Sequence, residues 1–203
     1  MVAAMTHATK ICLMLVLLAP ACNEKDEGPS ATATLIGLNG SGVSGTVRFT
    51  TMGDGVRVKG DVYGLTPGLH GIHIHEYGDC GASDGKSAGE HFNPIGHPHG
   101  NAGDASHPGD LGNLEADANG VARLAIDVGQ ITVDTEPLGV VGRSLVVHEM
   151  ADDLSTQPSG NSGARIACAV IRADAGQTVP VLQASAGDDA DDADDGDDEH
   201  EGD

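Results

Sequence analysis

Aromatic side chains are nearly missing from this sequence. Tryptophan is absent from its 203 residues, and Phe and Tyr together make up 2% of them. A hydrophobic core must therefore be built from Val, Ile, Leu and Ala. Glycine, by contrast, is abundant at 30 residues. Many glycines among scattered β-branched residues are typical of a turn-rich β protein and argue against a helical bundle.

Basic residues are also few. The chain has 10 Lys and Arg against 31 Asp and Glu, which gives a formal net charge of −21. This balance excludes a nucleic-acid-binding protein, because such a protein presents a basic face to phosphates. Eleven of the acidic residues fall within 187–203, where there is no Lys or Arg. Such a segment repels itself and has nothing to bury, so we predict a disordered, solubilising acidic tail over 176–203.

The apolar run near the N-terminus is too short to cross a membrane as a stable helix. It covers residues 11–18, follows the basic residue Lys10, and precedes the small residues Ala19-Pro20-Ala21. This pattern predicts a signal peptide over 1–21. We therefore expect an exported protein of the periplasm or cell envelope.

Cys22 comes directly after the predicted cleavage site. The run Leu-Ala-Pro-Ala-Cys resembles the lipobox of bacterial lipoproteins, although Ala19 stands where Leu is preferred. The chain has four cysteines. Removal of Cys12 with the signal leaves three, an odd number that an exported protein seldom keeps. We predict a lipid anchor at Cys22 and a flexible tether over 22–30; the alternative is a soluble periplasmic protein with an unpaired Cys22.

The segment over 31–175 has the period-two pattern of β-strands. Residues 55–62 and 121–128 alternate apolar and polar side chains, so each of these strands buries one face. The runs Met-Gly-Asp-Gly before the first and Asp-Ala-Asn-Gly before the second supply tight turns. The sequence therefore predicts one all-β domain.

Two long stretches, 78–114 and 149–164, interrupt this pattern and are rich in Gly, Asp, Asn, Pro and Ser. Long loops without secondary structure of their own are uncommon unless they are functional. Seven of the ten histidines lie between His70 and His107. We expect these loops and histidines to form the functional site.

His73 and His75 are two residues apart in an apolar run, so on a strand their side chains lie on the same face. His148 ends another apolar run, over 144–148. Imidazole ligands suit copper, and three rings held on strands would form a rigid copper site. Taken alone, His148 is better explained as a simple strand-end residue.

His91, His99 and His107 lie eight residues apart, and Asp110 follows three residues later. Three imidazoles and one carboxylate are a suitable tetrahedral set for zinc. The alternative is a merely histidine-rich, solvated loop, but the return to a strand pattern directly after Asp110 argues against it. His97 has no assigned role, and we expect it to be exposed to solvent.

In these motifs the chain resembles the copper,zinc superoxide dismutases, in particular bacterial members. The resemblance covers about Thr34 to Ala173. It implies an all-β fold, a Greek-key β-sandwich or barrel of about eight antiparallel strands with two long functional loops. The matching stretches are GLHGIHIHEYGDC (68–80), SAGEHFNP (87–94), HPGDLGN (107–113), GRSLVVHEMADDL (142–154) and GNSGARIACAVI (160–171).

The resemblance implies an antioxidant oxidoreductase that converts superoxide into oxygen and hydrogen peroxide while a bound copper is alternately reduced and oxidised. Zinc is the structural partner, and His91 bridges the two metals. The family's motifs imply copper ligands at His73, His75, His91 and His148, and zinc ligands at His91, His99, His107 and Asp110.

Further residues take roles through the same resemblance. Asp152 matches a carboxylate that accepts ring N–H bonds from one copper ligand and one zinc ligand, His73 and His99. Arg165 matches the arginine that guides superoxide to copper. Cys80 and Cys168 match a disulfide that ties the first long loop to the barrel, and an exported location suits this bond.

The chain departs from the well-known eukaryotic members in two places. Its second loop is shorter and lacks their acidic pair followed by a steering lysine, a role that Lys86 could take. The spacing from His99 to His107 is one residue shorter. The alternative function is an exported copper/zinc-binding buffer on the same fold, which would need neither Arg165 nor a bridging His91. A homodimer is left open.

Overall fold

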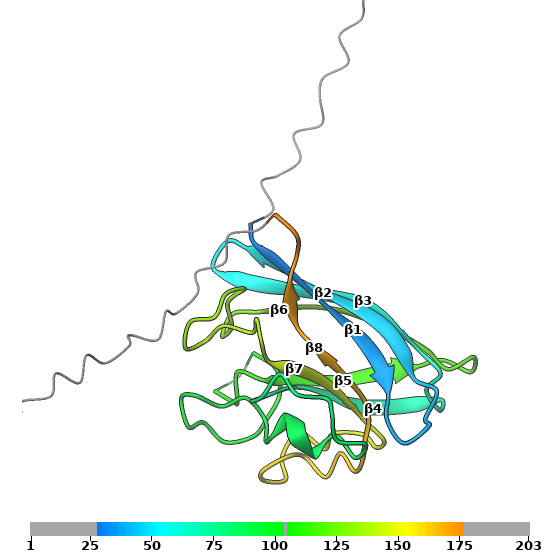
Figure 1. Ribbon diagram of the computed structural model, residues 1–203. Helices are drawn as coiled ribbons and strands as arrows, with labels where there is room; N and C mark the ends of the chain where they lie inside the picture. The colour runs from blue at the N-terminus through cyan, green and yellow to red at the C-terminus, as the bar shows by residue number, and fades with distance from the viewer. Residues whose placement is uncertain (1–27, 104, 177–203) are drawn as a thin grey trace, which may run out of the picture.

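The computed structural model describes residues 28–103 and 105–176, and in them it contains nine strands and one short 3-10 helix (Figure 1). The elements are β1 (Ser30–Gly37), β2 (Ser44–Met52), β3 (Gly55–Tyr63), β4 (Gly68–His75), η1 (Lys86–Ala88), β5 (Asp110–Ala116), β6 (Val121–Val128), β7 (Ser144–His148), β8 (Arg165–Val170) and β9 (Arg172–Ala173).

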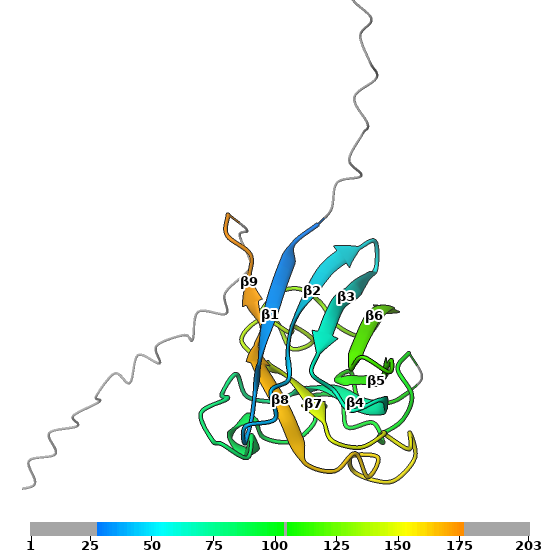
Figure 2. The same ribbon diagram turned by 90° about the vertical axis from the view of Figure 1, so that its right-hand side faces the viewer.

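The strands form a closed antiparallel barrel. They are hydrogen-bonded in the order β2-β3-β6-β5-β4-β7-β8-β1, and β1 also pairs with β2, which closes the ring. The short β9 follows β8 and pairs with the start of β1 (Figure 2). Because β3 lies beside β6 and β4 beside β7, the order is that of a Greek key. The predicted fold, with about eight antiparallel strands, is confirmed.

The barrel interior is aliphatic, as the composition required. Along β3 the side chains of Val56, Val58 and Val62 are buried between exposed neighbours. The β2–β3 hairpin turns at Gly53, whose positive φ of 61° glycine adopts without strain. Phe49 is the largest fully buried side chain among the described residues. The predicted strands over 55–62 and 121–128 are therefore confirmed.

Two long connections leave the barrel. One joins β4 to β5 over residues 76–109, and the other joins β7 to β8 over 149–164. The first loop ends earlier than the predicted 114, because Asp110 already pairs with His73 in the β4–β5 ladder. The loops meet where the Gln157 side chain bonds the backbone of His99. This contact brings the second loop against the histidine-rich first loop.

Several predicted segments lie outside the described residues. These are the signal peptide over 1–21, Cys22 with residues 23–27 of the tether, and the acidic tail from residue 177 onward. Within 28–103 and 105–176, no helix has the length and apolar character needed to cross a membrane.

Candidate metal centre

One face of β4 carries the start of the site. Ile72 and Ile74 pack into the barrel core, so the alternation of the strand turns His73 and His75 to the opposite face. Both rings are fully buried. The neighbouring strand β7 ends at His148. The ring of His148 stacks on that of His75, with the ring centroids 5.6 Å apart. Two adjacent strands thus bring three imidazoles together.

His91 completes this set from the first loop. A backbone bridge joins it to His75, and its ring centroid lies 4.0 Å from that of His73. We call these four residues the first histidine group; one ligand atom from each lies within 4.8 Å of the others. The members are His73, His75, His91 and His148.

A second cluster gathers around Asp110 at the start of β5. Its Oδ1 lies 2.9 Å from His91 Nδ1, 3.1 Å from His99 Nδ1 and 3.2 Å from His107 Nδ1. We call His91, His99, His107 and Asp110 the second histidine group, and their ligand atoms also lie within 4.8 Å of one another. His91 belongs to both groups. Its Nδ1 faces Asp110 in the second group, which leaves Nε2 for the first.

Three of the rings are anchored through their outer nitrogens. Asp152 accepts from His73 Nε2 at 2.8 Å and from His99 Nε2 at 2.9 Å, so one carboxylate joins the two groups. His75 Nδ1 donates to the carbonyl of Gly89 at 3.0 Å. Each anchored nitrogen holds the proton, which leaves the other nitrogen of that ring free to bind a metal.

Several inner nitrogens, in contrast, lack hydrogen-bond partners. Four are buried without one in the described part of the chain, and two of these, on His99 and His107, approach Asp110 Oδ1 without forming a hydrogen bond. Buried polar atoms are nearly always satisfied, so four orphaned nitrogens in two clusters require an explanation. Cations bound at the two clusters would satisfy all of them, and nitrogen with carboxylate donors fits copper and zinc. The atoms are His73 Nδ1, His91 Nε2, His99 Nδ1 and His107 Nδ1.

Burial sets the protonation of these groups. Loss of solvent, reinforced by the neighbouring His91, lowers the pKa of His73 and His75 far below the ordinary value, and that of His148 to about 3. Burial raises the pKa of Asp110, but hydrogen bonds from His91 and Gly100 outweigh it and the net direction is downward. Neutral imidazoles and an ionised carboxylate are the forms that bind metals.

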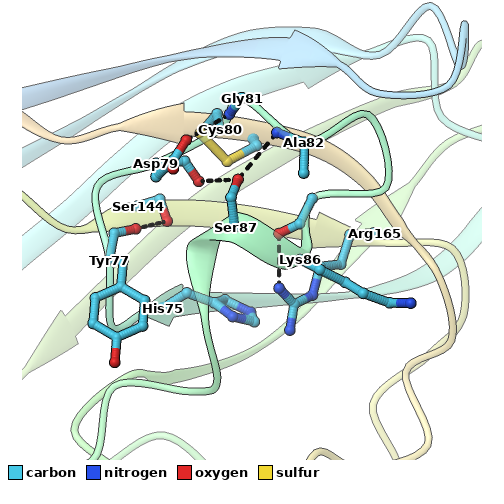
Figure 3. The surroundings of a disulfide bond; sticks show 12 residues. His75, Tyr77, Asp79, Cys80, Gly81, Ala82, Lys86, Ser87, Ser144 and Arg165 are labelled. Atoms are coloured by element: carbon cyan, nitrogen blue, oxygen red, sulfur yellow. Dashed lines mark hydrogen bonds between the residues drawn. A yellow bond between two sulfur atoms is a disulfide. The ribbon is translucent and has the colours of Figure 1, made fainter.

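Arg165, the first residue of β8, lies beside the first histidine group (Figure 3). Its guanidinium donates to the carbonyls of Gly85 at 2.8 Å and Gly89 at 2.7 Å. The Gly89 carbonyl also accepts from His75, so the arginine and this imidazole share one anchor. A fixed, half-buried positive charge next to the site is suited to an anionic substrate.

A disulfide holds the loop that carries these carbonyls. Cys80 in the first loop is bonded to Cys168 on β8, with the Cα atoms 5.8 Å apart (Figure 3). Arg165 lies three residues before Cys168 on the same strand. The bond therefore fixes the Gly85–Gly89 segment relative to the strand from which Arg165 projects.

Replacing Cys80 by serine should lower the free energy of unfolding by about 4 kcal/mol, because the bond closes a loop with a sequence separation of 88 residues. Denaturant unfolding of the variant and of the wild-type chain measures the difference. Reducing the wild-type disulfide should produce a similar loss. A change below about 1 kcal/mol would show that the barrel and loops hold together without the bond.

Two amide side chains were not anticipated from the sequence. Asn113 pairs with the backbone N–H and carbonyl of Asp152 at 2.8 and 2.9 Å. Gln157 pairs in the same way with His99, at 2.7 and 2.9 Å.

His97 is half-buried with Nδ1 3.2 Å from the Ser106 carbonyl, so the expectation of an exposed residue was wrong. The loop folds back at Asn93, which binds the His97 backbone.

Comparison with known proteins agrees with this geometry. The copper/zinc superoxide dismutase (SODC) family profile matches residues 43–171. A superoxide dismutase [Cu-Zn] of Onchocerca volvulus is 43% identical over 153 residues, 70% of this chain and 96% of the relative. The extracellular superoxide dismutase [Cu-Zn] of the same organism is 46% identical over 143 residues, 64% of this chain and 70% of the relative.

A third relative, the copper chaperone for superoxide dismutase of Rattus norvegicus, is 45% identical over 148 residues, which are 68% of this chain and 52% of the relative. The barrel, the two histidine groups and the sequence matches lead to one conclusion. The chain belongs to the copper/zinc superoxide dismutase family, and it is an oxidoreductase that dismutates superoxide with copper and zinc as cofactors.

Proposed function

We propose that the first histidine group holds the copper, the second holds the zinc, and His91 bridges the two metals. The observation that carries this assignment is the position of His91 in both groups, with Nδ1 toward Asp110 and Nε2 buried without a partner in the described residues. Four imidazoles suit copper, and three imidazoles with a carboxylate suit zinc.

The bound copper supplies the one-electron chemistry, in which two superoxide ions and two protons become oxygen and hydrogen peroxide. We assign to His91 Nε2 the holding of one of these protons between the two half-reactions. Nδ1, which lies 2.9 Å from Asp110 in the second histidine group, would stay bound on the zinc side and so keep the ring in place meanwhile. Asp152 fixes the protons of His73 and His99 on their outer nitrogens, so these rings present unprotonated nitrogens to the metals.

We assign to Arg165 the attraction and orientation of superoxide. The chain as a whole is acidic, with a formal net charge of −21, so an anion needs a local positive potential at the site. Steering of this kind raises encounter rates by roughly 10 to 10³-fold. The carbonyls of Gly85 and Gly89 hold the guanidinium in one orientation, so its charge is in place before the substrate arrives.

Metal analysis of three variants tests the ligand assignment. The wild-type chain should contain one copper and one zinc. His75→Ala should lose copper and keep zinc, His107→Ala should lose zinc and keep copper, and His91→Ala should weaken the binding of both. Elemental analysis after dialysis against a weak chelator gives the two contents. If His75→Ala and His107→Ala lose the same metal, the division into two sites is wrong.

Lys86 is the candidate for an additional steering charge. Its side chain is 82% exposed and lies 3.3 Å from Asp84, and the preceding residue Gly85 binds Arg165. Lys86→Glu should lower the dismutation rate roughly threefold at low salt and flatten its dependence on salt, because exposed charges act at long range only when they are unscreened. Lys59→Glu on β3 makes the same charge change as a control. If Lys86→Glu and Lys59→Glu had equal rates, Lys86 would have no specific role in steering superoxide.

We also propose the organisation given by the sequence: a signal peptide over 1–21, a tether over 22–30 with a lipid anchor at Cys22, the dismutase domain over 31–175, and a disordered acidic tail over 176–203. Export to the periplasm or cell envelope is supported by the signal pattern and by the disulfide. One relative is an extracellular dismutase. Mass spectrometry of the mature N-terminus tests the anchor, and sedimentation tests a homodimer.

A further inference from the structure

A buried serine hydroxyl lies behind the His148 ring. Ser162 Oγ is 3.1 Å from His148 Nδ1, and the residue is 2% exposed. The Gly163 carbonyl oxygen also faces this nitrogen, at the longer distance of 3.4 Å. Hydrogen bonds of this type are usually 2.7–3.2 Å long, so the serine hydroxyl is the better partner.

A second contact of the hydroxyl fixes the direction of this bond. Ser162 Oγ lies 3.0 Å from the carbonyl oxygen of Ser159, an atom that only accepts. The hydroxyl has a single proton and gives it to Ser159, so its oxygen accepts from His148 Nδ1–H. The ring therefore carries its proton on Nδ1. Its Nε2 keeps a free lone pair and points into the first histidine group, 3.4 Å from His75 Nε2.

Packing holds the serine in this position. A Cβ atom built on Gly71 of β4 would come within 2.9 Å of the Ser162 Cβ, so the bare backbone of Gly71 leaves the space that the serine fills. The other two strand histidines are anchored differently, His73 by a carboxylate and His75 by a backbone carbonyl. In the first histidine group, His148 is the ring whose outer nitrogen has a hydroxyl as its nearest partner.

We propose that Ser162 is a positioning residue that sets the balance between the two oxidation states of the bound copper. By accepting from His148 Nδ1–H, the hydroxyl fixes the ring's tautomer and strengthens electron donation from Nε2. A stronger nitrogen donor favours Cu(II) over Cu(I), which prefers softer ligands. This inference rests on the proposed role of His148 as a copper ligand.

The test compares Ser162→Ala with the wild-type chain, both loaded with zinc. Competition with chelators gives the Cu(II) and Cu(I) affinities, and redox titration gives the midpoint potential. The variant should bind Cu(II) about tenfold more weakly, the lower end of the usual effect of such partners. Cu(I) binding should change less, so the midpoint potential should rise, by about 59 mV if the whole tenfold effect falls on Cu(II). Equal weakening of both states, or none, would overturn the inference.

Two controls separate the possible failures. Ser30→Ala removes a buried hydroxyl on β1 whose partners are Asp174 and Arg48, and it should leave the potential unchanged. His148→Ala tests the assumption that His148 is a copper ligand. Wild-type Cu(II) affinity in this variant would show that it is not. If His148→Ala loses Cu(II) while Ser162→Ala keeps the wild-type affinities and potential, the ligand assignment stands and the role of Ser162 is wrong.

Discussion

Replacing His148 by alanine should lower the superoxide dismutation rate of the metal-loaded chain by at least about 100-fold. Changes to residues that merely support a ligand already cost 10–100-fold in metal affinity or activity, and His148 supplies one of the inner nitrogens itself. The variant also leaves a gap in a fully buried cluster, next to the ring of His75. The wild-type rate should be near the diffusion limit of roughly 10⁸–10⁹ M⁻¹s⁻¹.

Pulse radiolysis or stopped flow measures the rate, with the metal content determined on the same samples. Zinc should remain in the variant, because His148 does not belong to the second histidine group. His97→Ala is the matched control, since His97 lies in the first loop but in neither group. A His148→Ala variant that retains the wild-type rate with full copper would exclude His148 from the copper site.

The parts of the centre that the sequence predicted are those with a local signature. His73 and His75 are two residues apart on a strand, so their common face follows from strand geometry alone. The meeting of His148 with them depends on the pairing of β7 with β4, a contact across 75 residues of sequence. The pattern of residues along each strand does not reveal which strands pair. That pairing came from the resemblance of several ordered motifs to a known family.

The supporting residues had no local signature. Gln157 and Ser162 lie in a loop whose composition indicated only turns. Gln157 bonds to His99, 58 residues away, and the contact of Ser162 with His148 depends on how the serine side chain is oriented. Gly160 is a further example: a Cβ atom there would collide with the Asp152 carboxylate, so the loop needs glycine at this point. Such requirements follow from the packed loops, which sequence alone does not place.

Replacing Asp152 by alanine should weaken both metal sites at once. The carboxylate accepts two ring N–H bonds, one from each histidine group, through its two oxygens. Alanine removes both accepting oxygens, so the Nε2–H groups of His73 and His99 lose their partner. Each ring can then turn or move its proton to the inner nitrogen, where it blocks the metal. We expect zinc and copper affinities to fall by about 10–100-fold.

Asp153→Ala is the matched control, because Asp153 is the next residue and its carboxylate is exposed and, among the described residues, bonds within its own loop, at Ser155, Thr156 and Asn161. It should keep both metals. Chelator competition gives the two affinities, and thermal unfolding of the metal-free proteins shows how much of the effect is loss of fold. If Asp152→Ala weakened one metal alone, the carboxylate would not couple the sites. Weakening of both, with the metal-free fold intact, means that one buried carboxylate sets the protonation of a copper ligand and a zinc ligand together.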